Sequence, residues 1–266
     1  MPRSGGFRGG AVRVFSGPAL GATLASSRLA NELLHVDNLT KRFGESWALT
    51  GASFSVRAGE VLGLVGPNGS GKTTLLECVA GLLAADGGAV SLDDVPLAAE
   101  DRSRALFYMP DGIAPWPEQT VRWVTRFSAA VQGVPADRVA AVTRALALDR
   151  LATRRVGALS KGERKRLLIA LSLLTPQPFL LLDEPFDGLD LRQMREVAGV
   201  LRGADMAGAR ALLLSIHQLS DAGRVCDRLV LLSGGRVVGE GTLPELRARA
   251  GLPDEADVEK VFLALT

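Results

Sequence analysis

A glycine-rich segment of eight residues directly follows a short apolar run, and together they limit the folds open to this chain. The segment at residues 66–73 has the sequence GPNGSGKT, and the run at residues 61–65 has the sequence VLGLV. An apolar run of this length is typical of a strand buried in a parallel sheet. The segment matches G-x-x-x-x-G-K-[ST], a phosphate-binding pattern placed between a strand and a helix. We therefore expect a strand, a phosphate-binding loop and a helix that ends near Gly81.

The residue types in this loop suit phosphate chemistry. Glycines let the backbone curl so that successive N–H groups point at phosphate oxygens, and the helix that follows adds the positive end of its dipole. Lys72 is expected to reach the β- and γ-phosphates, and the Thr73 hydroxyl to bind Mg²⁺. The alternative is a glycine-rich turn with a chance lysine, which the complete pattern in its proper context disfavours.

A second apolar run ends in two acids. Residues 179–182 have the sequence FLLL, and Asp183, Glu184 and Pro185 follow. Carboxylates at the end of a buried strand need partners. We expect Asp183 to hold Mg²⁺ through water and Glu184 to orient and deprotonate an attacking water. The alternative, two solvated loop acids, loses weight beside a phosphate-binding loop.

Strand and helix patterns alternate along most of the chain, which indicates a mostly parallel sheet covered on both faces. Further strands are expected at residues 33–36, 48–56, 89–92, 105–109, 211–215, 229–232 and 236–238, with a turn at 41–44. Further helices are expected at residues 120–132, 137–148, 160–174, 191–202 and 243–250. Residues 111–175 are therefore predicted to form a helical insert.

Charge and cysteine content narrow the function classes. The 266 residues contain 31 Lys and Arg against 29 Asp and Glu, a net charge of +2 that argues against a nucleic-acid partner. Two cysteines far apart favour a reducing compartment. The strongest apolar stretch, residues 167–174, is far shorter than the roughly 20 residues of a spanning helix. Any link to a membrane would need spans from another chain.

The first 31 residues differ from the rest because they lack Asp and Glu and contain scattered arginines among small residues. We interpret residues 1–31 as a disordered extension, with a transit peptide as the alternative on composition alone.

Residues 159–163, with the sequence LSKGE, resemble the LSGGQ signature of the ATP-binding subunits of ABC transporters. The resemblance runs from about Leu33 to the C-terminus, and Lys161 and Glu163 depart from the commonest signature. The same residues also fit an ordinary capping box with Ser160 as N-cap and Glu163 at the third helical position. Both interpretations can hold together, since the start of a helix is also an anion site.

The resemblance implies a fold and two small-molecule partners. It implies an α/β P-loop NTPase with a RecA-like core, a mostly parallel sheet, an antiparallel β edge subdomain and a helical insert. One ABC-type ATPase domain would span residues 32–266. Its core would be 32–110 and 176–250, its insert 111–175, and a C-terminal helix would cover 254–265. ATP and Mg²⁺ are the implied cofactors.

The site residues implied by the resemblance belong to two copies of the chain. Within one copy, nucleotide contacts fall to Phe43, Gly66, Asn68, Gly69, Ser70, Gly71, Lys72, Thr73 and Thr74. Ser160 and Gly162 would face the γ-phosphate held by the opposite subunit. His217 would hold the γ-phosphate and the water beside Glu184. Phe43 would stack on adenine, with Trp47 a competitor for that role and a hairpin-core position the alternative for Phe43.

One position departs from the resembled pattern. Asp111 stands where those subunits usually have glutamine, which offers a neutral amide oxygen to Mg²⁺ and the water. A carboxylate is shorter and charged but still suits Mg²⁺. We expect Asp111 to be a metal ligand together with Thr73 and Asp183, with an altered metal dependence.

The resemblance further implies a separate transmembrane permease subunit and either a homodimer or a paralogous ATPase partner. Trp116 or Trp123 would line the groove for the permease, unless they pack inside the insert. The C-terminal region resembles ABC-2-type exporter subunits, which favours export and a cytoplasmic location on the inner face of the membrane. Two alternatives remain: a soluble ABC-type ATPase acting on a macromolecular complex, and an inactive adaptor, which Lys72 and Glu184 disfavour.

Overall fold

A six-stranded sheet forms the centre of the fold in the computed structural model, which describes residues 33–203 and 210–266. Residues 1–31, the expected disordered extension, lie outside the described residues. The strand order is β10-β9-β3-β8-β7-β6, and only β10 runs antiparallel to its neighbour. The strands are β3 (Val61–Val65), β6 (Leu106–Met109), β7 (Phe179–Leu182), β8 (Ala211–Ile216), β9 (Arg228–Ser233) and β10 (Arg236–Gly241). The expected mostly parallel sheet is confirmed.

A second, antiparallel sheet has the order β2-β1-β4-β5 and confirms the expected β edge subdomain. It contains β1 (Leu33–Phe43), β2 (Ser46–Arg57), β4 (Gly87–Leu92) and β5 (Val95–Pro96). The turn predicted at 41–44 was wrong, because β1 continues to Phe43 and pairs there with Ser46. The chain reverses only at Gly44 and Glu45, where Gly44 takes a φ of 59°.

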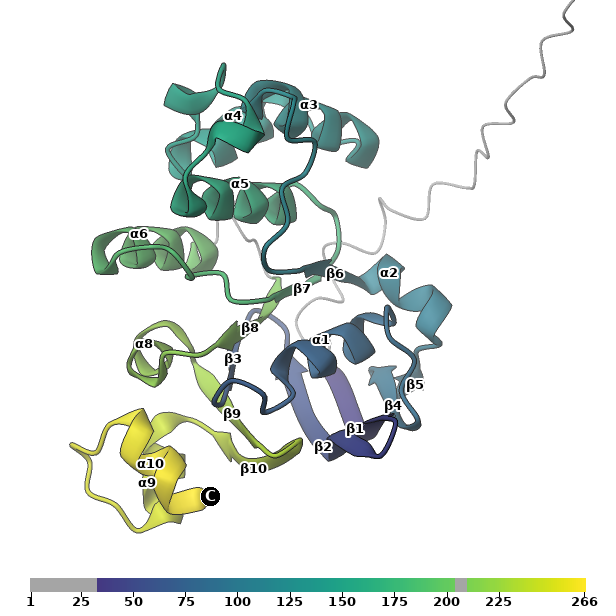
Figure 1. The fold of residues 1–266 in the computed structure, drawn as a ribbon, viewed down its shortest axis with the longest axis vertical. Coiled ribbons are helices and arrows are strands. Elements are labelled where there is room, and N and C mark those ends of the chain that lie inside the picture. Colours follow the sequence, from purple (N-terminus) through teal and green to yellow (C-terminus); the bar gives the residue numbers. More distant parts are fainter. Residues whose placement is uncertain (1–32, 204–209) are drawn as a thin grey trace, which may run out of the picture.

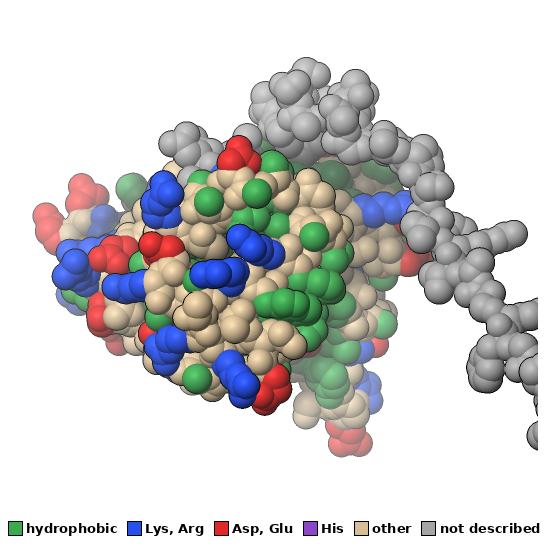
Figure 2. All heavy atoms as spheres, turned by 90° about the horizontal axis from the view of Figure 1, so that it is seen from above, with side chains coloured by type: hydrophobic (Ala, Val, Ile, Leu, Met, Phe, Trp, Pro, Cys, Tyr) green, Lys and Arg blue, Asp and Glu red, His purple; other side chains and the backbone are tan. Residues whose placement is uncertain are grey.

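Helices cover the central sheet and form the predicted insert (Figure 1). The phosphate-binding loop leads into α1 (Lys72–Ala80), and Gly81 caps its end with a φ of 78°. The insert consists mainly of α3 (Val121–Gln132), α4 (Ala136–Ala145) and α5 (Lys161–Leu173), at one end of the molecule in Figure 1. Short helical turns are η1 (Ala99–Asp101), α2 (Arg102–Ala105), η2 (Asp149–Leu151) and η3 (Val156–Ala158). The surface of this end mixes basic and hydrophobic side chains (Figure 2).

Four more helices lie in the described part of the chain after Asp190. They are α6 (Leu191–Arg202), α8 (Leu219–Val225), α9 (Leu243–Ala250) and α10 (Val258–Leu265). The C-terminal helix begins at Val258 rather than at residue 254, since the Asp257 side chain accepts a hydrogen bond from Lys260 N and caps it there. The sequence patterns gave no sign of α8, which at seven residues is too short for a helical period to be recognised.

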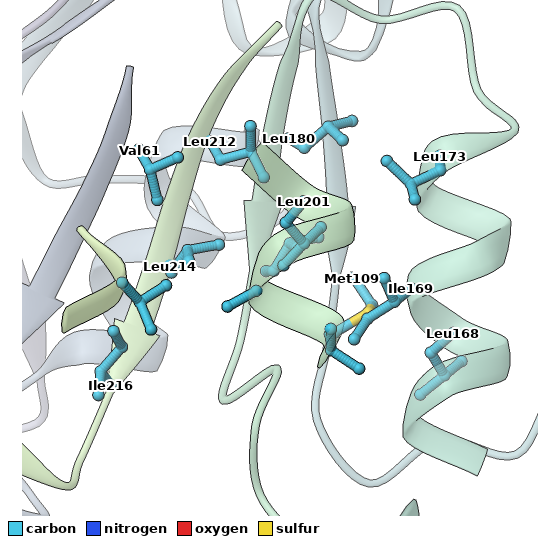
Figure 3. Close-up of a cluster of buried hydrophobic side chains, with 14 of the residues drawn as sticks. Val61, Met109, Leu168, Ile169, Leu173, Leu180, Leu201, Leu212, Leu214 and Ile216 are labelled. Carbon is cyan, nitrogen blue, oxygen red and sulfur yellow. The ribbon is translucent and has the colours of Figure 1, made fainter. Parts of the chain in front are cut away.

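Two hydrophobic cores lie on opposite faces of the central sheet because neighbouring residues of a strand point to opposite sides. On one face, Leu180, Leu212 and Leu214 pack with α5 and α6 residues such as Ile169 and Leu201 (Figure 3). The residues between them in the strands, such as Leu181 and Leu213, join a second core with α1 and the antiparallel sheet. The continuous apolar runs of the sequence therefore correspond to strands buried on both faces.

No helix within 33–203 and 210–266 combines the length and the apolar character needed to cross a bilayer.

Candidate active site

The phosphate-binding loop lies between β3 and α1, as predicted. A Cβ at Gly66 would come within 2.2 Å of Leu232 O, and one at Gly71 within 2.6 Å of Ala48 O. Gly71 also has a φ of 103° at the N-cap of α1, a conformation that L side chains rarely adopt. Only glycine therefore fits these positions of the loop, which accounts for both fixed glycines of the pattern. Asn68 and Gly69 are exposed at the loop tip, and Thr74 is half-buried on α1.

Lys72 is buried beneath the loop. Its Nζ donates to Gly66 O at 2.8 Å and Pro67 O at 3.1 Å. Burial lowers the pKa of this ammonium, while the charges of Glu184 and Asp183 act to raise it. The loop therefore has a cation beneath it and a buried Ser70 hydroxyl that has no hydrogen-bond partner among the described residues. An unpaired buried donor at this place fits a loop whose partner is an anion.

Three hydroxyl groups surround the Asp183 carboxylate at the end of β7. Thr73 Oγ1 donates to Asp183 Oδ2 at 2.9 Å, and Tyr108 donates to the same oxygen at 3.3 Å. Ser215 donates to Asp183 Oδ1. Burial, reinforced by the Asp183 charge, raises the pKa of Tyr108 well above its usual value, so Tyr108 stays a donor. Thr73 and Asp183, far apart in the sequence, thus present adjacent oxygen atoms of the kind that Mg²⁺ prefers.

Glu184 is held in a strained backbone conformation directly after Asp183. Its φ is 46°, which non-glycine residues rarely adopt and which is concentrated at functional sites. Its N–H donates to Ser215 Oγ at 2.8 Å, so one hydroxyl fixes both neighbouring acids. Glu184 lines a pocket of about 130 Å³ together with His217, which follows β8. The structure therefore brings together the two residues expected to act on the attacking water.

Asp111 lies apart from the Thr73–Asp183 pair in its contacts. Its Oδ1 accepts a hydrogen bond from Lys165 Nζ at 2.6 Å, and its carboxylate lies near those of Glu184 and Asp187, with oxygens within 4.8 Å of one another. Burial acts to raise the pKa of Asp111, but Lys165, the Gly112 N–H and Lys161 together lower this pKa below its usual value. Asp111 thus lies beside Glu184, the expected general base.

The start of α5 is a capping box, as the local interpretation predicted. Ser160 Oγ accepts from Glu163 N at 3.2 Å, and Glu163 Oε2 accepts from Ser160 N at 2.8 Å. Ser160 is exposed, so the helix start is open to a ligand or a second chain. A Cβ at Gly162 would come within 2.9 Å of Gly188 O, which explains why glycine stands there. The capping box can therefore stabilise α5 while the start of the helix remains accessible to a ligand.

Two aromatic side chains stand exposed at the hairpin next to the loop. Phe43 is 52% exposed and Trp47 is 54% exposed, so neither is a core residue of the hairpin. Trp47 precedes Ala48, whose carbonyl oxygen lies against Gly71. Lys41 and Arg42 lie over the rings of Phe43 and Trp47 respectively. Each ring is about half exposed and could stack on a planar ligand through the part that the neighbouring cation does not cover.

The comparisons with known proteins agree with this geometry. Residues 49–187 match the family model described as ABC transporter. The chain is 36% identical over 210 residues, 77% of its length, to the Nod factor export ATP-binding protein I of Burkholderia lata, of which the match covers 69%.

The chain belongs to the ABC transporter ATP-binding family.

Other relatives support the same assignment. The corresponding protein of Ralstonia nicotianae is 34% identical over 236 residues, covering 86% of this chain and 71% of that protein. A solved structure described as the ATP-binding subunit of an ABC transporter superposes with a TM-score of 0.77 at 29% identity, covering 88% of this chain and 99% of the other. This ABC ATPase is therefore a nucleotide-binding, ATP-hydrolysing subunit, as expected.

Three residues of the site were not identified from the sequence. Ser215 sits in an apolar strand, and its polarity at the end of a buried run was the available signal. Tyr108 lies within a short strand, and nothing in its neighbourhood distinguished it. Lys165 follows Lys161 by one helical turn, so both lysines lie on the same face of α5. This spacing was a weak signal in the sequence that the two lysines share a role.

Proposed function

We propose that this ABC ATPase hydrolyses Mg²⁺-ATP in a head-to-tail pair and drives a separate membrane-spanning subunit, in export. The observation that supports the reaction best is the Asp183–Glu184 pair: Asp183 contacts Thr73 at 2.9 Å, while Glu184 lines one pocket with His217. A glycine-rich loop, two adjacent oxygen groups and the Glu184 carboxylate thus lie at one edge of the sheet, which supports these proposed roles.

In the proposed reaction, water attacks the γ-phosphorus and the bond to the β-phosphate oxygen breaks. The loop N–H groups and Lys72 bind the phosphates, Glu184 accepts the proton of the water, and His217 holds the γ-phosphate and the water in position. Thr73 and Asp183 would hold Mg²⁺, with Asp111 as a further candidate ligand. When bound, Mg²⁺ neutralises the charge that develops on the phosphates.

Each nucleotide would be closed in by a second copy or by a paralogous subunit. Ser160 is exposed at the start of α5, whose helix dipole and first backbone N–H groups would bind a γ-phosphate, while Gly162 behind it is buried against Gly188. The start of α5 and the phosphate-binding loop before α1 belong to different elements. This separation fits a nucleotide pocket formed by the loop of one chain and the helix start of another.

An exposed aromatic cluster on the insert is the proposed docking surface for the membrane subunit. Trp123 and Phe127 stack at 4.8 Å between ring centroids, and Trp116 meets Phe127 edge-on at 5.4 Å. All three are at least 40% exposed, so the alternative that both tryptophans pack inside the insert loses weight. Exposed aromatic clusters of this kind are typical interface anchors. Docking here would place the subunit on the inner face of the membrane.

Export is proposed from the relatives rather than from the site. The proteins of Burkholderia lata and Ralstonia nicotianae are named as Nod factor export ATP-binding proteins. The transported substrate would be selected by the membrane subunit.

Replacing one of the two exposed hairpin aromatics is expected to weaken ATP binding. A base–aromatic stack contributes about 1–3 kcal/mol, so Phe43→Ala should raise the KM for ATP by about 5- to 150-fold with little change in kcat. Trp47→Ala, on the facing strand, is the matched variant. A steady-state ATP titration of both variants decides which ring stacks. If both KM values match that of the wild type, the hairpin does not bind adenine.

Replacing Trp123 by alanine is expected to separate docking from hydrolysis. Loss of a central aromatic anchor weakens interfaces by about 2 kcal/mol or more, roughly 30-fold in Kd. ATPase activity of the isolated subunit should stay at the wild-type level. Binding is measured by co-purification with a candidate membrane-spanning subunit, and Val131→Ala on the same helix, also exposed, is the control. Equal recovery of all three proteins would refute the proposed surface.

A further inference from the structure

Two lysines on one face of α5 contact two carboxylates of neighbouring loops. Lys161 Nζ lies 2.5 Å from Asp187 Oδ2, and Lys165 Nζ lies 2.6 Å from Asp111 Oδ1. The lysines are one helical turn apart, immediately after Ser160. Helix α5, whose start would form the second half of the proposed pocket, is therefore joined by ion pairs to the loop that contains Asp111 and to the loop that contains Asp187.

The two ion pairs differ in burial. The Lys161 side chain is 64% exposed, so its pair with Asp187 contributes little. The Lys165 side chain is only 3% exposed, while that of Asp111 is 39% exposed. A nearly buried ammonium is strongly disfavoured without a carboxylate partner. Lys165 consequently needs an anion, and Asp111 supplies it.

The carboxylate of Glu184, the proposed general base, lies close to that of Asp111. The carboxylate oxygens of Asp111, Glu184 and Asp187 lie within 4.8 Å of one another. Like charges this close repel, and a cation freed from one carboxylate is drawn to the next. The contact between Lys165 and Asp111 thus keeps the cation off Glu184 and screens Glu184 from the Asp111 charge.

We propose that Lys165 is a positioning residue for ATP hydrolysis: it holds and neutralises Asp111, so that Glu184 remains unpaired and available to the attacking water. This proposal rests on the proposed function of Glu184. Related subunits usually have a neutral side chain where this chain has Asp111. The ion pair of Asp111 with Lys165 has no net charge, so the proposal explains how a charged Asp111 can stand at this position.

The test is a double-mutant cycle on the full chain, measured as ATPase rate. Asp111→Gln leaves Lys165 without its partner. Lys165 should then pair with Glu184, which should lower kcat by about tenfold. Lys165→Met leaves Asp111 charged beside Glu184 and should lower kcat to a similar extent. The double variant removes both charges, and its kcat should exceed that of either single variant. Lys165→Arg, which retains the cation, should rescue most of the rate.

A second readout does not depend on activity. The melting temperature of the nucleotide-free protein should fall by about 5 °C in Asp111→Gln, which strands a buried cation, and should recover in the double variant. Arg166→Met is the matched control, because Arg166 is a nearly buried cation on the same helix whose partner, Glu196, lies on α6. This control should lose stability while keeping the wild-type kcat and KM.

Two outcomes would overturn the proposal. If the effects of Asp111→Gln and Lys165→Met on kcat simply multiply, the pair does not act as a unit. If Arg166→Met lowers kcat as much as Lys165→Met does, the effect is general destabilisation. Failure of the proposed function is distinguishable, since the wild-type chain would then show no Mg²⁺-ATPase activity at all, whatever the variants do.

Discussion

Substitution of Glu184 by glutamine is expected to reduce ATP hydrolysis by about 10²- to 10⁴-fold, the usual contribution of a general base. The amide retains the size and hydrogen-bonding capacity of the side chain but cannot accept the proton of the attacking water. Lys72, Thr73 and the loop are untouched, so ATP binding should persist. The protein should therefore accumulate as an ATP-bound pair of subunits, because the step that reopens the pair is blocked.

The measurement combines two observations on the same sample. Phosphate release gives the rate, and size-exclusion chromatography with Mg²⁺-ATP gives the subunit number. Glu259→Gln, an exposed acid on α10 far along the chain from the site, is the matched control and should behave as the wild type. A Glu184→Gln variant that hydrolyses ATP within about threefold of the wild-type rate would remove Glu184 from the role of base.

The strained backbone of Glu184 sharpens this prediction. Its φ of 46° is accompanied by the hydrogen bond that its N–H donates to Ser215 Oγ. A glutamine tolerates this conformation as well as glutamate does, so the fold should be preserved. Loss of activity can then be attributed to the carboxylate rather than to a displaced loop.

Many of the strands and helix ends could be predicted from sequence patterns that depend only on neighbouring residues. Strands β3 and β7 had the predicted bounds, because a continuous apolar run between glycines or before acids fits a strand buried on both faces. The end of α1 at Gly81 and the cap of α5 at Ser160 also followed, since capping depends on residues a few positions apart.

The parts that could not be predicted depend on partners distant in the sequence. The pairing of Lys41 with Leu49 extends β1 through a segment that looks like a turn. The contact of Lys165 with Asp111 joins residues 54 positions apart and cannot be predicted from the sequence pattern. The same holds for Ser215, which joins Asp183 and Glu184 from a neighbouring strand. Motifs therefore located the reacting groups, while tertiary contacts determined how their charges are balanced.

A mixture of two inactive variants is expected to regain activity if two chains share each nucleotide pocket. Lys72→Ala removes the phosphate cation from one half of a pocket, and Ser160→Arg blocks the helix start that forms the other half. Each variant alone should lose activity by about 10²-fold or more, since both of its pockets are damaged. In a mixed pair, one pocket contains both changes and the other contains neither.

The size of the recovery follows from symmetry. Random pairing of equal amounts gives mixed pairs as half of the population, each with one intact pocket, so about a quarter of the wild-type rate is expected if the pockets act independently. The chains are mixed before Mg²⁺-ATP is added, and the rate is measured against the total subunit concentration. Ser160→Arg also removes a helix cap, at a cost of about 1 kcal/mol, so its melting temperature is recorded first. A folded Ser160→Arg chain that restores no activity to Lys72→Ala would show that the start of α5 does not complete the pocket of a second copy.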